Sequence, residues 1–163
     1  MPSFDVVSEP DMHEVQNAFD QALREVRQRY DFQGTDAALE QLDDSGFKAA
    51  ANSEERTKAI ASVLQDKFVK RKISLKYIDV EEAQPSGGKM WNLSIKLKKG
   101  LDSPNAKKIV QMIKEKKSLK VTPSIQGDLV RVTGKKKDNL QEVMGFLKES
   151  DLPVALSFKN FRD

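Results

Sequence analysis

The sequence predicts an α+β protein made of two tandem ferredoxin-like units, each with the element order βαββαβ. Two observations lead to this prediction. Apolar residues recur at helical spacing in some segments and alternate with polar residues in others. The resulting order of elements then occurs twice, with Gly46 corresponding to Gly127 and Ile60 to Leu140, about 80 residues apart. Both helices of such a unit pack on one face of its sheet and leave the other face open.

The first half contains two amphipathic helices separated by a hairpin. Val15, Phe19 and Val26 lie on one stripe of the first helix. Residues 43–46 (DDSG) predict the hairpin turn between two short strands. The predicted elements are strand 4–8, helix 11–30, strands 36–42 and 46–51, helix 54–71 and strand 73–79.

The second half follows a predicted loop at residues 85–88 (PSGG) and repeats the same order. Ser103 followed by Pro104 predicts a helix start, with the serine as the cap. Residues 126–128 (QGD) predict the turn of the second hairpin. The predicted elements are strand 90–98, helix 104–117, strands 119–126 and 129–134, helix 136–148 and strand 154–159.

Charge is divided along the chain in a way that the net charge of +3 conceals. Residues 1–88 hold 11 Lys/Arg and 17 Asp/Glu, whereas residues 89–148 hold 15 Lys/Arg and 5 Asp/Glu. A cationic segment of this size favours a phosphate-bearing partner. A solvated lysine surface without a ligand is the alternative, and charge alone does not decide between them.

Composition and motifs argue against several classes of protein. The chain has no cysteine, which excludes disulfides and thiolate chemistry. The start, MPSFDVVSEPDM, does not resemble a secretory signal, and no apolar run approaches the roughly 20 residues that span a bilayer. We therefore expect a cytoplasmic protein with no membrane contact. The single histidine, His13, has no second His or Cys to form a metal set. No nucleophile or phosphate-loop motif is present, so we expect no metal, no cofactor and no enzymatic activity.

The segment 128–137 (DLVRVTGKKK) is the most suggestive for binding. Strand alternation directs Arg131 to the open face of the sheet, and the chain then turns at Gly134. Lys135, Lys136 and Lys137 gather before the predicted helix. Backbone N–H groups at a helix start beside lysines suit a phosphate group, although lysine runs after strands are often only solvated loops.

The same alternation predicts an open face rich in hydroxyl groups and lysines. Trp91 and Phe158 have the inward parity, so stacking of bases on sheet aromatics, as in many RNA-binding domains of this fold, is disfavoured. The predicted open-face residues of the second half are Asn92, Ser94, Lys96, Lys98, Lys120, Thr122, Ser124, Gln126, Arg131, Thr133, Ser157 and Lys159.

Five segments together resemble the YajQ family of bacterial proteins. They are PSFDVVSE at the start, YDF at 30–32, AKKIVQMIKEKKSLKV, IQGDLVRVTGKKKDNLQEVM and the ending FKNFRD. The resemblance covers nearly the whole length. This sequence departs from the family pattern at Gln33-Gly34 and at Ser103-Pro104-Asn105, which leaves the choice of ligand open.

The resemblance implies that the two units exchange their first strands, which periodicity cannot show. Strand 90–98 would then belong to a domain of residues 11–98, and residues 1–10 and 99–163 would form the other domain. Lys96 and Lys98 would move to the other sheet with their strand. The family is described as nucleotide-binding, with RNA, guanine nucleotides and cyclic di-GMP among the proposed ligands. The resemblance supplies no settled site motif.

Two functions follow as hypotheses. The first is a non-enzymatic protein that binds RNA, such as tRNA, or a guanine nucleotide such as cyclic di-GMP, as a regulatory effector that acts with a transcription regulator. Its predicted contacts are Arg131, Lys135, Lys136, Lys137, Lys96 and Lys98. The alternative is a protein–protein adaptor with acidic and basic halves, in which polyanion binding is incidental. An enzyme acting on a nucleotide is the least supported, because no base, nucleophile or metal set is evident.

Overall fold

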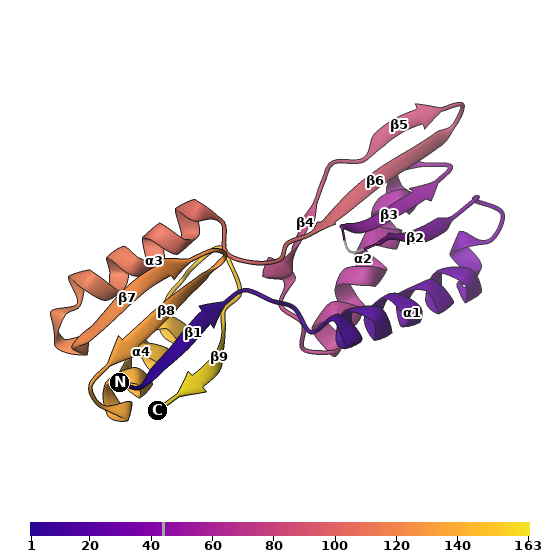
Figure 1. Cartoon of the computed structure of the whole chain (residues 1–163). Coiled ribbons are helices and arrows are strands. Elements are labelled where there is room, and N and C mark those ends of the chain that lie inside the picture. Colours follow the sequence, from indigo (N-terminus) through magenta and orange to yellow (C-terminus); the bar gives the residue numbers. More distant parts are fainter. Residues whose placement is uncertain (44) are drawn as a thin grey trace. The chain divides into compact units, whose positions relative to one another are not determined.

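The computed structural model describes residues 1–43 and 45–163 and divides the chain into two compact units (Figure 1). One unit, here called the discontinuous unit, comprises Met1–Glu9 and Lys99–Asp163, and the other, the central unit, comprises Pro10–Lys98. Each contains an antiparallel sheet and a pair of helices, so the predicted α+β class with tandem ferredoxin-like units is confirmed.

The discontinuous unit has the sheet order β7-β8-β1-β9, with all neighbours antiparallel. The first strand of the chain therefore lies between two strands from the second half of the sequence. Its elements are β1 (Ser3–Val7), α3 (Ser103–Glu115), a 3-10 turn (Lys117–Leu119), β7 (Val121–Gln126), β8 (Leu129–Gly134), α4 (Lys137–Glu149) and β9 (Ser157–Arg162).

The core of the discontinuous unit lies between this sheet and its two helices. Phe4 and Val6 of β1 and Val130 and Val132 of β8 are fully buried and belong to one cluster with the inner faces of α3 and α4. The alternation predicted for β8 is thus correct: its valines face the helices, and Leu129, Arg131 and Thr133 face the opposite side. Phe4 also packs edge-on against Phe158 of β9, with 5.6 Å between the ring centroids.

The central unit has the sheet order β2-β3-β6-β4, and β5 also pairs with β6. The strand exchange is visible in the pairing of β6 with β3, in which Lys96 lies opposite Gly46 and Trp91 opposite Ala51. The elements are α1 (Met12–Gln28), a 3-10 turn (Tyr30–Phe32), β2 (Ala38–Leu42), β3 (Gly46–Ala51), α2 (Glu54–Lys70), a 3-10 turn (Leu75–Tyr77), β4 (Ile78–Val80), β5 (Gln84–Gly87) and β6 (Met90–Leu97).

Three aromatic rings form the centre of this second core. Phe47 of β3 stacks on Phe19 of α1, with 5.7 Å between the centroids, and meets Phe68 of α2 edge-on at 6.2 Å. Phe47 and Phe68 are fully buried. The helical stripes read from the sequence therefore point into the core, because only one face of each helix contacts the sheet.

Several predicted boundaries were wrong for local reasons. The strand predicted at 73–79 contains a 3-10 turn at Leu75–Tyr77 instead, because the Ser74 side chain accepts a hydrogen bond from the Lys76 N–H at 3.1 Å, and β4 begins only at Ile78. The loop predicted at 85–88 contains β5, which pairs with the start of β6. The last strand begins at Ser157 rather than 154, and β7 begins at Val121 rather than 119, after a 3-10 turn.

The caps and turns also differ in part. The cap of α3 is Asp102, whose carboxylate accepts from the Asn105 N–H at 2.9 Å, and Ser103 is the first helical residue. The hairpin predicted at 43–46 does join β2 to β3, but its residue Asp44 lies outside the described residues.

Candidate functional site

The open face of the discontinuous unit carries a carboxylate that the surrounding side chains almost completely cover. Asp5 of β1 lies opposite Arg131 of β8 and Lys159 of β9, and it is only 1% exposed. Its two carboxylate oxygens accept from the Arg131 Nε at 2.9 Å and from the Asn160 Nδ2 at 2.9 Å. An Arg162 Nη2 lies 3.5 Å away. A charge in this position is tolerated because several donors satisfy it.

A backbone irregularity brings the last of these donors into place. The pairing of β1 with β9 shifts between Ser3 and Asp5, and Asn160 adopts a φ of 59°. Asparagine tolerates this left-handed conformation better than most residues do. The bulge turns the Asn160 side chain toward Asp5.

These contacts set the protonation of the pair. The hydrogen bond from Arg131 holds the pKa of Asp5 below its ordinary value, and the hydrogen bond from Asn160 acts in the same direction against the effect of burial. The same bond raises the pKa of Arg131. Arg131 retains 33% exposure of its side chain, so part of its guanidinium faces solvent beside the ion pair.

A basic pocket of ≈ 420 Å³ opens at one end of this face. Thr122 of β7 and Thr133 of β8 lie directly opposite each other and both line the pocket. Lys120 lines it from the residue before β7, and Lys135 and Lys136 line it from the loop before α4. Its other lining residues are Met1, Gly134 and Asn139. We call these eight residues the basic pocket.

The charge of the basic pocket is not neutralised by its surroundings. Lys120, Lys135 and Lys136 form no ion pair with any residue in 1–43 or 45–163, and the residues that line the pocket include no carboxylate. Three ammonium groups and two hydroxyls around one hollow are donors suited to a phosphate group.

The start of α4 adds backbone donors to the same region. Its cap residue is Lys136, whose side chain makes no capping hydrogen bond, so the first N–H groups of the helix are not satisfied by a side-chain cap. Gly134 lets the end of β8 lie close to both β7 and α4, because a Cβ there would lie 3.0 Å from the Val121 Cγ1 of β7 and 3.3 Å from the Leu140 Cδ2 of α4. The positive end of the helix dipole adds to the positive electrostatic potential that the lysines create there.

The structure separates the predicted contacts into groups. Lys135 and Lys136 lie together in the basic pocket, whereas Lys137 is the first residue of α4 and its Nζ contacts Asp163 at 2.7 Å. Arg131 lies next to Thr133 on the open face of β8 but is engaged by Asp5.

The other two predicted lysines belong to the central unit. Lys96 lies on β6 and its Nζ contacts Glu81 at 3.1 Å, and Lys98 contacts Asp79 at 3.6 Å. The strand exchange therefore also redistributes charge between the units. The discontinuous unit holds 14 Lys/Arg and 10 Asp/Glu, and the central unit holds 14 Lys/Arg and 15 Asp/Glu. The charge contrast between the units is smaller than the contrast along the chain.

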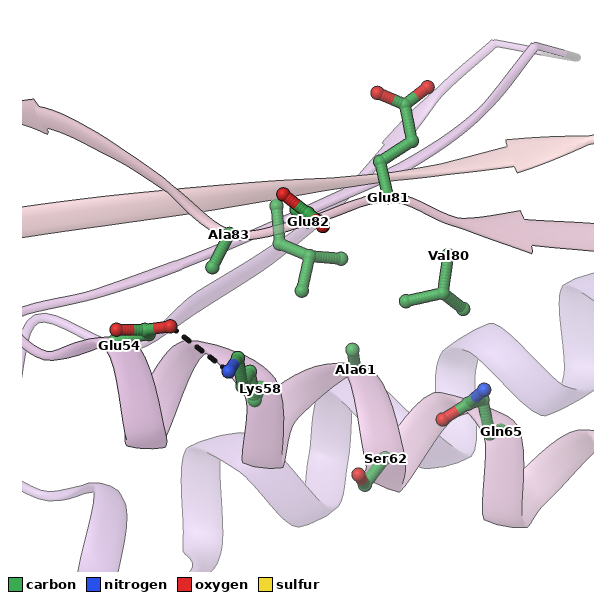
Figure 2. A pocket seen from close by; sticks show the side chains of 10 residues that line it. Glu54, Lys58, Ala61, Ser62, Gln65, Val80, Glu81, Glu82 and Ala83 are labelled. Atoms are coloured by element: carbon green, nitrogen blue, oxygen red, sulfur yellow. Dashed lines mark ion pairs between the residues drawn. The ribbon is translucent and has the colours of Figure 1, made fainter.

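A second pocket, of ≈ 520 Å³, lies in the central unit between α2 and the segment that joins β4 to β5 (Figure 2). In Figure 2 Val80 points toward α2, whereas Glu81 points away from it. Glu54, Glu81 and Glu82 line this pocket with a single lysine, Lys58, whose Nζ contacts Glu54 at 3.0 Å. Its excess of carboxylates makes it unsuitable for a phosphate.

Sequence reasoning missed some of the residues that matter here. Asp5 could have been noticed, because an acidic residue between apolar neighbours in a buried strand requires a partner. Asn139 and Met1 carried no such signal. The inward parity of Trp91 and Phe158 placed both in the core, but the structure leaves both only half-buried. Tyr30 is 89% exposed, which no periodicity indicates.

No set of three or more His, Cys, Asp or Glu side chains that would hold a metal ion occurs among the described residues. Likewise, in the part of the chain that the structure describes, every helix is too short or too polar to cross a membrane.

Comparison with known proteins gives matches along nearly the whole chain. A family model described as "Nucleotide-binding protein YajQ-like" matches residues 2–162. A nucleotide-binding protein of Thermobifida fusca is 49% identical over 160 residues, which cover 98% of this chain and 97% of that protein. Nucleotide-binding proteins of Anaeromyxobacter sp. strain K and Tolumonas auensis are 45% and 44% identical over 163 residues, with complete coverage of both chains in each case.

Proposed function

Because the chain belongs to the family of YajQ-like nucleotide-binding proteins, we propose that it binds a nucleotide or RNA through the basic pocket of its discontinuous unit. The observation that carries the proposal is the set of three lysines without an ion-pair partner among the described residues, gathered around one pocket at the start of α4. The names of the relatives support the class of ligand, and the charge and donors of the pocket support the location.

Each residue has a defined role in this proposal. Lys135 and Lys136 neutralise a phosphate group together with Lys120, and the first N–H groups of α4 donate to its oxygens. The hydroxyls of Thr122 and Thr133 donate to a second oxygen or to a ribose.

Arg131 and Lys137 are contacts of a second kind, because each must share or release a carboxylate to reach a ligand. Arg131 can offer the exposed side of its guanidinium to a guanine edge or a phosphate while it remains bonded to Asp5. Lys137 has an exposed partner, Asp163, and exchanges it for a phosphate at little cost.

Lys96 and Lys98 lie in the central unit and are paired with carboxylates. In this proposal they serve a separate contact with a longer ligand such as RNA, and they make a smaller contribution than Lys135 and Lys136.

The open face favours contact with the backbone of a nucleic acid over base stacking. Thr122, Ser124, Arg131 and Thr133 line adjacent positions of β7 and β8, and these positions provide hydroxyls and a cation rather than rings. The ligand is then RNA, including tRNA, or a compact guanine nucleotide such as cyclic di-GMP. The protein acts without catalysis, as a cytoplasmic regulatory effector that transmits ligand binding to a partner such as a transcription regulator.

The proposal is tested by calorimetric titration of nucleic-acid-free protein with cyclic di-GMP, GTP and a short single-stranded RNA. The double variant Lys135→Ala/Lys136→Ala should weaken binding at least about tenfold, since it removes two phosphate contacts. The matched control Lys89→Ala/Lys108→Ala removes the same charge from exposed positions outside the basic pocket and should bind like the original protein. If both double variants weakened nucleotide binding equally, the attraction would be a diffuse electrostatic one, and the basic pocket would be rejected as the binding site.

A protein–protein adaptor is the second candidate, and the acidic pocket of the central unit favours it. Glu82 lines this pocket without an ion pair to any described residue, together with the apolar Val80 and Ala83. In that case nucleotide binding should disappear at moderate salt without a saturable site. A stoichiometric protein partner should then remain bound after nuclease treatment.

A further inference from the structure

A groove of ≈ 460 Å³ lies between α3 and β7 in the discontinuous unit. Figure 1 shows α3 running alongside β7, which is the last strand of the sheet order on this side. The apolar part of the groove is formed by Val110 of α3 and Ile125 of β7, and Ile125 is 42% exposed. Lys107, Lys114 and Lys117 surround it. This groove is separate from the basic pocket and shares no lining residue with it.

The free edge of β7 presents backbone groups that a further strand can bond. The Gly134 N–H donates to the Pro2 carbonyl at 3.1 Å, away from β7, so the pair Val121–Gly134 exchanges no hydrogen bonds. Because pairs alternate along an antiparallel ladder, Val121, Pro123 and Ile125 direct their backbone groups outward. Pro123 has no backbone N–H and can lie in a strand only where its nitrogen faces away from the paired strand. Its outward-facing position in β7 agrees with this register. No strand among the described residues occupies that side of β7.

The side chains of the same three residues point toward the helices, as the burial of Pro123 shows. A strand added at this edge would therefore direct every second side chain into the groove. The edge thus supplies hydrogen bonds, and the groove supplies a place for an apolar side chain, which is the arrangement used in recognition by strand addition.

The charges around the groove select an acidic occupant. Lys107, Lys114 and Lys117 form no ion pair with any residue that the structure describes, and Glu115, the one acidic lining residue, bonds the Gln111 side chain at 3.0 Å. Lys107 and Lys114 are two helical turns apart, about 10.5 Å along the axis. Residues four apart in a strand span about 13 Å. Two acidic side chains that flank one apolar side chain on the same face of a strand therefore match the two lysines.

We propose that the groove between α3 and β7 binds an extended acidic segment of a partner protein, which adds as an antiparallel strand to β7. An apolar side chain of that segment lies between Val110 and Ile125, and acidic side chains two positions before and after it meet Lys107 and Lys114. Pro123 offers only its carbonyl in the middle of this edge, so the added strand is bonded mainly by the N–H and carbonyl of Ile125. An apolar groove floor and a ladder of backbone bonds fit a peptide better than RNA.

The test uses the full chain labelled with ¹⁵N and a synthetic heptapeptide with glutamate at positions 2 and 6, isoleucine at position 4 and threonine elsewhere. On titration, the amide signal of Ile125 should shift and its hydrogen exchange should slow, since the peptide isoleucine bonds the backbone of Ile125. A peptide with its isoleucine N-methylated should bind at least about tenfold more weakly, since it loses one backbone hydrogen bond and adds a clash. Absence of any shift up to about 1 mM peptide, the weak end of specific affinity, would overturn the proposal.

Three variants locate the site. Ile125→Asp should weaken binding about tenfold, by loss of the apolar contact, and Lys114→Glu about fivefold, by loss of a surface ion pair. The control Lys108→Glu makes the same charge change on α3 outside the groove and should leave affinity unchanged. Equal weakening by Lys114→Glu and Lys108→Glu would mean diffuse attraction. If an RNA octamer displaced the peptide and shifted the Ile125 amide signal in the same way, the groove would be a general binding site for polyanions. Either result rejects the proposal.

Discussion

The pairing of Asp5 with Arg131 makes a specific prediction about stability. Replacing Asp5 with asparagine keeps the shape of a side chain that is 1% exposed but removes its charge. The carboxylate accepts from Arg131 at 2.9 and 3.4 Å and from Asn160 at 2.9 Å. Hydrogen bonds to a charged group contribute about 1.5–3 kcal/mol, and Arg131 can regain water because it is partly exposed. We therefore expect the variant to lose about 2 kcal/mol, or about 8–16 °C in Tm for a unit of this size.

The effect should also depend on pH in a defined direction. The pKa of Asp5 is lowered in the folded protein, mainly by its hydrogen bond with Arg131. The carboxylate therefore stabilises the fold above the ordinary aspartate pKa of about 3.9, and this stabilisation is lost as pH falls through the lowered folded value. The difference between the original protein and Asp5→Asn should be constant from pH 7 to about pH 5 and shrink below pH 4.

Urea unfolding followed by far-UV circular dichroism at several pH values measures both quantities. The control Asp151→Asn changes an exposed aspartate of the same unit and should stay within about 0.5 kcal/mol of the original protein. A loss of less than about 0.5 kcal/mol for Asp5→Asn at pH 7 would refute the reasoning. A difference that grows as the pH falls would refute it as well, because it would mean that the carboxylate is not held in its charged form.

Three further predictions concern the core of the central unit, the glycine at the end of β8 and the salt dependence of RNA binding. Phe47→Ala removes the ring between Phe19 and Phe68 and should cost about 3–5 kcal/mol, which the fluorescence of Trp91 in the same unit would report during urea unfolding. Gly134→Ala places a Cβ 3.0 Å from Val121 and should cost about 1–3 kcal/mol; an unchanged Tm would contradict this. If single-stranded RNA is the ligand, each lysine of the basic pocket replaced by alanine should reduce the slope of log K against log salt by about 0.7, whereas Lys108→Ala should not change it.

Much of the fold was predictable because periodicity reflects which face is buried. The stripes on α1 and α2 and the alternation of β8 follow directly from one-sided packing. Periodicity carries no information about which sheet a strand joins, since β6 would show the same alternation in either unit. The pairing partners of β1 and β6 therefore came only from the family resemblance. The 3-10 turn at Leu75–Tyr77 escaped prediction because its alternating residues imitate a strand.

The candidate site was less predictable for a related reason. Lys135 and Lys136 stood out as neighbours in the sequence, and Thr122, Thr133 and Lys120 were placed on the open face by parity. Their meeting in one pocket depends on the register between β7 and β8. The engagement of Arg131 depends on Asp5, 126 residues away, and no local pattern reveals such a contact.

The position of β1 in the middle of its sheet affects how the chain folds as it is synthesised. Phe4 and Val6 are synthesised before their partners on β8 and β9, which follow more than a hundred residues later. At about 5–20 residues per second, this apolar segment waits roughly 8–30 s without its neighbours. The central unit has by then been translated in full between β1 and its partners. Newly made chains should therefore expose the apolar side chains of β1 until β8 and β9 are made, and their yield should depend on the speed of translation and the supply of chaperones.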